Sequence, residues 1–174
     1  MEYEKKPSKF TWEGLGDIGE GRKNLGDSMP VIVYRLFQYT LKDILAREYS
    51  PEQAAALYRA AGHLAGTEFA RHLLDLTGDF DYFVANLQNQ LQNFKVGIMK
   101  IEKANLETLS LTLTVSEDLD CSGLPVTDET VCDYDEGFIA GILEAYTGKA
   151  FNVIEIDCWA SGDRTCRFTA KPIK

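Results

Sequence analysis

The stretch from Cys121 to Cys166 constrains this chain most, because it contains all four cysteines. Glu155 and Cys158 lie three residues apart, Cys166 follows eight residues later, and Cys132 lies 23 residues before Glu155. Three thiols and one carboxylate can hold a single tetrahedral metal ion, and zinc suits this donor set best. Four protein ligands leave no open coordination position, so such a zinc site would be structural.

The spacing of these residues leaves two other interpretations open. The thiols could be small buried side chains that bind nothing, with Glu155 exposed at a sheet edge. Cys121 could replace Glu155 as a ligand, or it could simply pack under a loop. Against the exposed position, Glu155 interrupts an apolar strand row formed by Phe151 and Val153, where a buried carboxylate needs a partner.

Composition and length limit the other classes of function. A chain of 174 residues predicts one domain, and we expect a flexible N-terminal arm at residues 1–20 and a single domain at residues 21–174. The net charge of −9 and the lack of a basic patch argue against nucleic acid and anionic membrane surfaces as partners. No signal peptide or apolar run of membrane-spanning length is visible, so a cytoplasmic location is expected.

Hydrophobic periodicity predicts three helices, a hairpin, a fourth helix and a second hairpin. The helices are expected at residues 28–47, 51–77, 80–94 and 133–146, and the strands at 96–103, 109–115, 151–157 and 165–170. The glycine-rich segment 10–26 is expected to form turns around a short strand or two. The pattern therefore predicts an α+β fold, with an antiparallel sheet of about four strands and helices packed on one side.

Pairs of glycines mark two of the expected helices. Gly62 and Gly66 are four residues apart on the second helix, and Gly137 and Gly141 are four apart on the fourth. Glycine weakens a helix relative to alanine, so packing is the expected compensation. Both pairs predict close approach of another element.

No catalytic set is visible in the sequence. There is no serine–histidine–aspartate arrangement, no HExxH motif and no flavin or nicotinamide motif. A group of acidic residues before and within the fourth helix is expected to cap that helix and face water: Asp118, Asp120, Asp133, Asp135 and Glu136. A binding or carrier role is therefore favoured over an enzyme.

Several short motifs resemble the 4-vinyl reductase domain family. They are Cys121-Ser-Gly-Leu-Pro125, Val131-Cys132-Asp133, Glu136-Gly-Phe-Ile-Ala-Gly141, Thr147-Gly-Lys149, Glu155-Ile-Asp-Cys158 and Gly162-Asp-Arg-Thr-Cys-Arg-Phe168. Gly21-Arg-Lys-Asn-Leu-Gly26 and Gly62-His-Leu-Ala-Gly66 fit the earlier half of the family pattern. The resemblance implies a ligand-binding fold shared with TRAPP transport-complex subunits and with the sensor domains of phenol-responsive activators.

The family also implies homodimers, an enclosed pocket for a small hydrophobic molecule, and one zinc ion. At the family's spacing the zinc ligands are Cys132, Glu155, Cys158 and Cys166, which leaves Cys121 as a non-ligand. An ungapped placement of the sensors' pocket assigns it to six apolar residues: Leu76, Phe83, Leu109, Leu111, Ile142 and Val153. Where the phenol sensors offer a histidine and a tryptophan, this chain has Phe83 and Leu111, which favours a more apolar ligand.

Three hypotheses about function follow. The first is a homodimeric sensor or carrier of a small hydrophobic molecule, with a structural zinc and a signalling protein as a further partner. The second is an enzyme or chaperone that acts on a tetrapyrrole, as the family name implies. The third is a scaffold without a ligand, which predicts a filled core and an exposed apolar patch.

Overall fold

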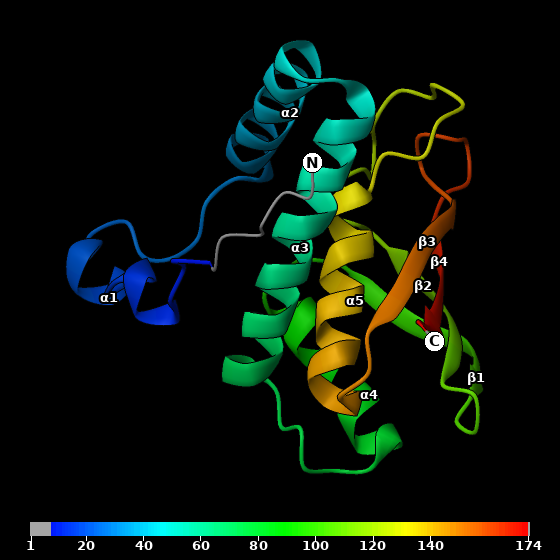
Figure 1. The fold of residues 1–174 in the computed structure, drawn as a ribbon. Helices are drawn as coiled ribbons and strands as arrows, with labels where there is room; N and C mark the ends of the chain where they lie inside the picture. Colours follow the sequence, from blue (N-terminus) through cyan, green and yellow to red (C-terminus); the bar gives the residue numbers. More distant parts are fainter. Residues whose placement is uncertain (1–7, 174) are drawn as a thin grey trace.

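A four-stranded antiparallel sheet in the order β1-β2-β4-β3 forms one layer of the protein (Figure 1). This computed structural model describes residues 8–173. The strands are β1 (Ile98–Asn105), β2 (Ser110–Ser116), β3 (Phe151–Asp157) and β4 (Cys166–Pro172). The alternation in β2 is confirmed, because Leu111, Leu113 and Val115 are all buried. The two predicted hairpins thus join through β2 and β4 into one sheet.

Helices cover one side of the sheet, as predicted. They are α2 (Val31–Glu48), α3 (Pro51–Leu73), α4 (Phe80–Asn93) and α5 (Asp133–Thr147). Capping residues fix several of the ends: Ser50 and Asp79 accept backbone N–H bonds at the starts of α3 and α4, and Gly148 ends α5 in the left-handed conformation. Helix α5 contacts β3, and α3 lies beside α5 (Figure 1).

The predicted glycine seam joins α3 to α5. A Cβ atom at Gly62 would overlap the backbone carbonyl of Tyr134, and one at Gly66 would overlap that of Phe138. On the facing helix, a Cβ atom at Gly137 would meet the carbonyl of Arg59. The two backbones are therefore in direct contact, which only glycine permits.

The prediction for the glycine-rich segment was wrong. Between residues 8 and 26 the structure has a 3-10 turn, Trp12–Leu15, and the short helix α1, Ile18–Gly21, instead of strands. The side chains of Thr11 and Asp17 accept the backbone N–H groups of Gly14 and Glu20, which stabilises these local turns. Residues 1–7 of the predicted arm lie outside the described part of the chain, and the division into arm and domain stays a prediction.

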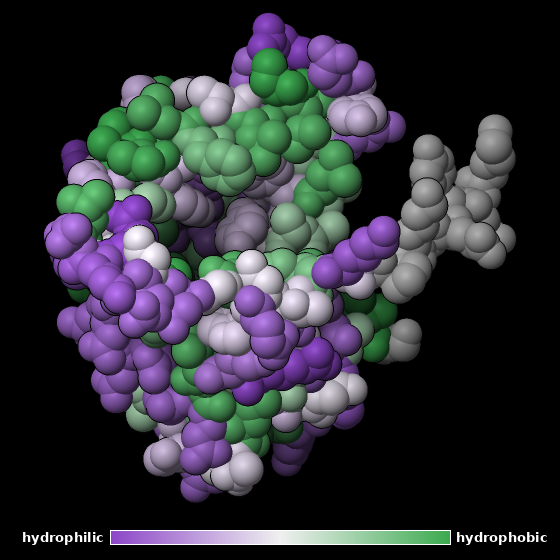
Figure 2. Space-filling view, turned by 90° about the vertical axis from the view of Figure 1, so that its left-hand side faces the viewer, coloured by the Kyte–Doolittle hydropathy of each residue, from purple (hydrophilic) through white to green (hydrophobic). Residues whose placement is uncertain are grey.

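Helix α2 presents an apolar face to solvent. Its only buried residue is Gln38, whereas seven large apolar residues are exposed: Val31, Ile32, Val33, Leu36, Phe37, Leu41 and Ile44. Hydrophobic side chains gather along the top of the face in Figure 2, above a hollow. A groove of about 490 Å³ between α2 and α3 includes Phe37, Leu41 and Leu57. Among residues 8–173, no helix is long and apolar enough to cross a membrane.

Candidate metal centre and apolar pocket

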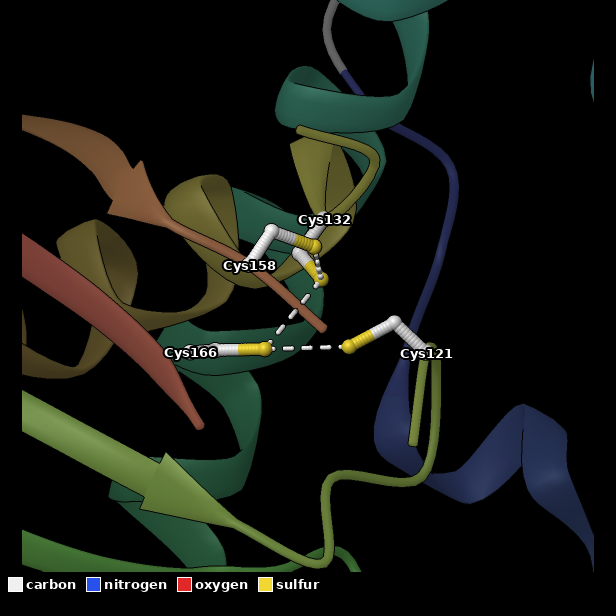
Figure 3. Close-up of side chains that lie close together, drawn as sticks. All are labelled: Cys121, Cys132, Cys158 and Cys166. Carbon is white, nitrogen blue, oxygen red and sulfur yellow. Dashed lines mark hydrogen bonds between the residues drawn. The ribbon is translucent and has the colours of Figure 1, made fainter. Parts of the chain in front are cut away.

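Four segments of the chain bring the cysteines together. Cys132 immediately precedes α5, Cys158 follows β3, Cys166 begins β4, and Cys121 lies in the loop after β2 (Figure 3). All four side chains are buried and none forms a disulfide. Their Sγ atoms all lie within 4.8 Å of one another. The cluster thus joins the start of α5 to the last hairpin.

The spacing of the sulfur atoms suits a tetrahedral metal ion. Thiolates about 2.3 Å from zinc stand about 3.8 Å apart in a tetrahedron. The Sγ atom of Cys132 lies 3.9 Å from those of both Cys158 and Cys166. The Sγ atoms of Cys121 and Cys166 are closer, at 3.0 Å, than two zinc-bound thiolates would be.

Glu155 lies beside the cysteine cluster, in an irregular part of β3. The pairing of β3 with β4 shifts register between Glu155 and Asp157. The carboxylate is only 5% exposed, and its Oε2 atom accepts a hydrogen bond from the backbone N–H of Cys132 at 3.1 Å. Its Oε1 atom is buried without a hydrogen-bond partner among the described residues. A bound cation would satisfy this oxygen.

Three of the four predicted ligands therefore lie within the group of mutually close donor atoms. They are Cys132, Cys158 and Cys166, and the fourth sulfur is that of Cys121 rather than an oxygen of Glu155. The sequence alone did not place Cys121 here, because the loop that carries it follows no periodic pattern. Arg35 of α2 holds this loop, since its guanidinium donates to the carbonyls of Leu119 and Ser122.

The pKa values in the cluster fit a site that lacks compensating positive charge. Hydrogen bonds with the other thiols lower the pKa of Cys158 and raise that of Cys132. Burial raises the pKa of Glu155 to about 8. The cluster thus accepts one negative charge and resists further ionisation. A divalent cation reverses this resistance, because it stabilises thiolates and carboxylates together.

The acidic residues near α5 do not face water as predicted. Asp118, Asp120, Asp135 and Glu136 are all buried, because α2 and α3 cover them. Asp120 accepts hydrogen bonds from Tyr34 Oη at 2.8 Å and from Gln38 Nε2 at 2.6 Å.

Arg59 of α3 forms ion pairs with Glu136 and Asp133. Tertiary partners more than 70 residues away in the sequence decide this burial, so local helix-capping rules could not predict it.

An apolar pocket lies between α4, α5 and the sheet. Its wall includes Phe83 and Leu87 from α4, Leu113 from β2, and Ile139 and Ile142 from α5. The free space is about 40 Å³, slightly more than the roughly 30 Å³ that one water molecule occupies in the liquid. A cavity of about 150 Å³ accepts benzene, so a ligand of that size enters only if the wall moves.

The six predicted pocket residues divide into three groups. Phe83, Leu111 and Ile142 line this pocket. Leu109 and Leu111 line a neighbouring cavity of about 160 Å³, next to Tyr146. Leu76 and Val153 pack in or against the core and line neither cavity.

Two polar residues that the sequence did not single out for the pocket also line it, Asp118 and Asp135. Asp135 shares its helical face with Ile139 and Ile142, at intervals of four and seven residues, and this spacing was the available signal.

Comparison with protein families assigns the C-terminal part of the chain. Residues 111–172 match the model of the 4-vinyl reductase domain. Two uncharacterised proteins of Methanocaldococcus jannaschii are 27% identical over 106 residues and 28% identical over 85 residues. These matches cover 61% and 49% of this chain, and 60% and 50% of the two relatives. The chain thus spans only about half to three fifths of the length of these relatives.

Solved structures share the fold over most of the chain. The phenol-responsive sensory domain of the transcription activator PoxR, solved with phenol, has a TM-score of 0.65 at 15% identity, covering 85% of this chain and 78% of that one. A vinyl-4-reductase family protein from Methanocaldococcus jannaschii has a TM-score of 0.63 at 18% identity, covering 97% and 100%. Trafficking protein particle complex subunit 3 from Naegleria fowleri, covalently bound to palmitic acid, has a TM-score of 0.61 at 10% identity, covering 83% and 98%. The chain therefore carries a 4-vinyl reductase domain, on a fold that it shares with these three proteins.

Proposed function

We propose that this protein binds a small apolar molecule between α4, α5 and the sheet, as a sensor or carrier and not as an enzyme. The observation that carries the proposal is the pocket wall, which consists of apolar side chains except for two residues. The PoxR domain was solved with phenol, and the trafficking subunit with palmitic acid. Both examples support an apolar ligand on this fold.

Helix α4 is the element most suited to admit the ligand. It supplies five residues of the wall: Phe80, Phe83, Val84, Leu87 and Leu91. Of the other helices and strands, it contacts mainly β1, whereas α5 packs on both α3 and β3. A shift of α4 would enlarge the small free space without breaking the glycine seam or the cysteine cluster.

We also propose that a structural zinc is held by Cys132, Glu155, Cys158 and Cys166. The unpartnered Oε1 atom of Glu155 supports this set, and so does the short separation of Cys121 from Cys166. When bound, the ion supplies positive charge that neutralises the buried thiolates and the carboxylate. The competing set replaces Glu155 with Cys121, and the presence of its sulfur in the cluster favours that set.

Two substitutions distinguish these ligand sets. Glu155→Gln should weaken zinc binding by at least about tenfold, because a neutral amide is a poor ligand, whereas Cys121→Ser should change it by less than about threefold. Competition with a chromophoric chelator measures both affinities. Visible spectra of the cobalt-substituted proteins supply a second readout, because each thiolate lost weakens the sulfur-to-cobalt absorption. A larger loss in Cys121→Ser than in Glu155→Gln would exchange the two roles.

The exposed face of α2 supports the homodimer that the family resemblance implies. Seven large apolar side chains along one helix form more exposed apolar surface than a soluble monomer usually carries. A second copy of the chain would bury this face. The same observation favours the scaffold as a second candidate function, because a scaffold also needs an apolar docking surface and does not need a ligand.

Native mass spectrometry of the purified protein separates these functions. We expect two chains per particle, one zinc ion per chain and a bound small apolar molecule. Phe37→Asp should yield monomers that keep zinc, because Phe37 lies on α2, apart from the cysteine cluster. A dimer without any small molecule, and without a response to added apolar compounds, would favour the scaffold. A tetrapyrrole or redox cofactor in the particle would favour the enzyme or chaperone.

A further inference from the structure

Two carboxylates interrupt the apolar wall of the pocket. Every other residue that lines it is apolar, whereas Asp118 and Asp135 are acidic. Asp118 follows β2 and Asp135 lies in the first turn of α5. A carboxylate oxygen of each lies within 4.8 Å of the other and of the Sγ atom of Cys132. The two acids therefore meet at the end of the pocket nearest the cysteine cluster.

Both carboxylates are buried without a positive partner. Asp118 is 4% exposed and Asp135 is 9% exposed. Asp118 Oδ1 accepts the backbone N–H groups of Asp120 at 2.8 Å and Cys121 at 3.1 Å. Asp135 Oδ2 has no hydrogen-bond partner within residues 8–173, and neither acid takes part in a salt bridge there. A buried carboxylate in this state is costly unless a donor or a cation reaches it.

The neighbouring buried acids have partners, so Asp118 and Asp135 differ from them. Asp120 is bound by Tyr34 and Gln38. Glu136 pairs with Arg59 and also accepts the backbone N–H of Glu155. The two acids that lack such side-chain partners are the two that line the pocket.

We propose that the ligand of this pocket has an apolar body and a cationic amine end, and that Asp118 and Asp135 bind the amine. An ammonium group has several N–H donors and a positive charge, so it can serve both carboxylates, which no side chain of the wall can do. The apolar residues of α4 and α5 would surround the body. The inference rests on the proposed ligand-binding function and narrows its ligand class.

A matched series of compounds tests this proposal in the full-length, zinc-loaded protein. Benzylamine, benzyl alcohol and toluene share one aromatic body and differ in the end group. Isothermal titration of the wild-type protein should show benzylamine binding at least about tenfold more tightly than toluene, with benzyl alcohol between them. Equal affinities for benzylamine and toluene would overturn the amine assignment and leave the apolar pocket in place. If none of the three binds, both the proposed function and this inference fail.

Substitutions then assign the preference to the two carboxylates. Asp135→Asn should remove most of the preference for benzylamine while toluene binding stays, and Asp118→Asn should do the same. Asp81→Asn is the control, because Asp81 is an exposed acid in the first turn of α4. An unchanged preference in both pocket variants would contradict the proposal. Loss of zinc from these variants, with the preference retained, would assign the two acids to the metal centre instead.

Discussion

Replacing Cys158 with serine should lower the free energy of unfolding of the zinc-loaded protein by about 3 kcal/mol or more, because zinc binding is coupled to folding and serine is a poor zinc ligand. For a domain of this size, that loss corresponds to a fall in melting temperature of roughly 6–12 °C. Cys158 links the end of β3 to Cys132 at the start of α5. Weaker zinc binding would therefore loosen the last hairpin from the helix.

Chelation provides the matched comparison for this substitution. Removing zinc should destabilise the wild-type protein strongly and Cys158→Ser much less, because the variant has already lost most of the zinc contribution. Differential scanning calorimetry with and without a chelator measures both effects. Cys121→Ser serves as the control, since Cys121 is equally buried but is not among the proposed ligands. If the chelator leaves the wild-type melting temperature unchanged, the structural role of zinc is wrong.

The sequence predicted those parts of the fold whose signal is local. Leu111, Leu113 and Val115 alternate with polar residues, and this alternation alone identifies β2. The capping sequence at Ser50 and the glycine at position 148 gave helix ends that the structure confirms. Residue spacing and the family resemblance together brought Cys132, Cys158 and Cys166 to one place.

The parts that the sequence did not predict depend on distant contacts. Cys121 joins the cluster because Arg35 and Tyr39 of α2 bind the loop around it, and no local pattern records those contacts. Asp135 looked like a helix-capping acid, yet it occupies a position on the buried face of α5. The face of α2 is apolar at helical spacing but exposed, because the burial of such a face depends on a partner outside the single chain.

The glycine seam carries the second large prediction. Gly66→Ala should destabilise the protein by about 3 kcal/mol or more, since the added Cβ overlaps the backbone carbonyl of Phe138 and forces α3 away from α5. A carbonyl held in a helix cannot turn aside as a flexible side chain can. Thermal unfolding should show a fall in melting temperature of roughly 6–12 °C. Gly137→Ala tests the same contact from α5, because its Cβ would meet the carbonyl of Arg59.

Helix propensity alone predicts the opposite sign, which makes the result decisive. Alanine favours a helix over glycine by about 1 kcal/mol, so Gly66→Ala would stabilise α3 if its backbone were free. Ala60→Gly is the matched control on the exposed side of the same helix, and it should cost only that amount. The two single variants of the seam should also combine with less than additive cost, because one separation of the helices relieves both overlaps. A melting temperature for Gly66→Ala at or above that of the wild type would show that the α3 and α5 backbones are not in contact.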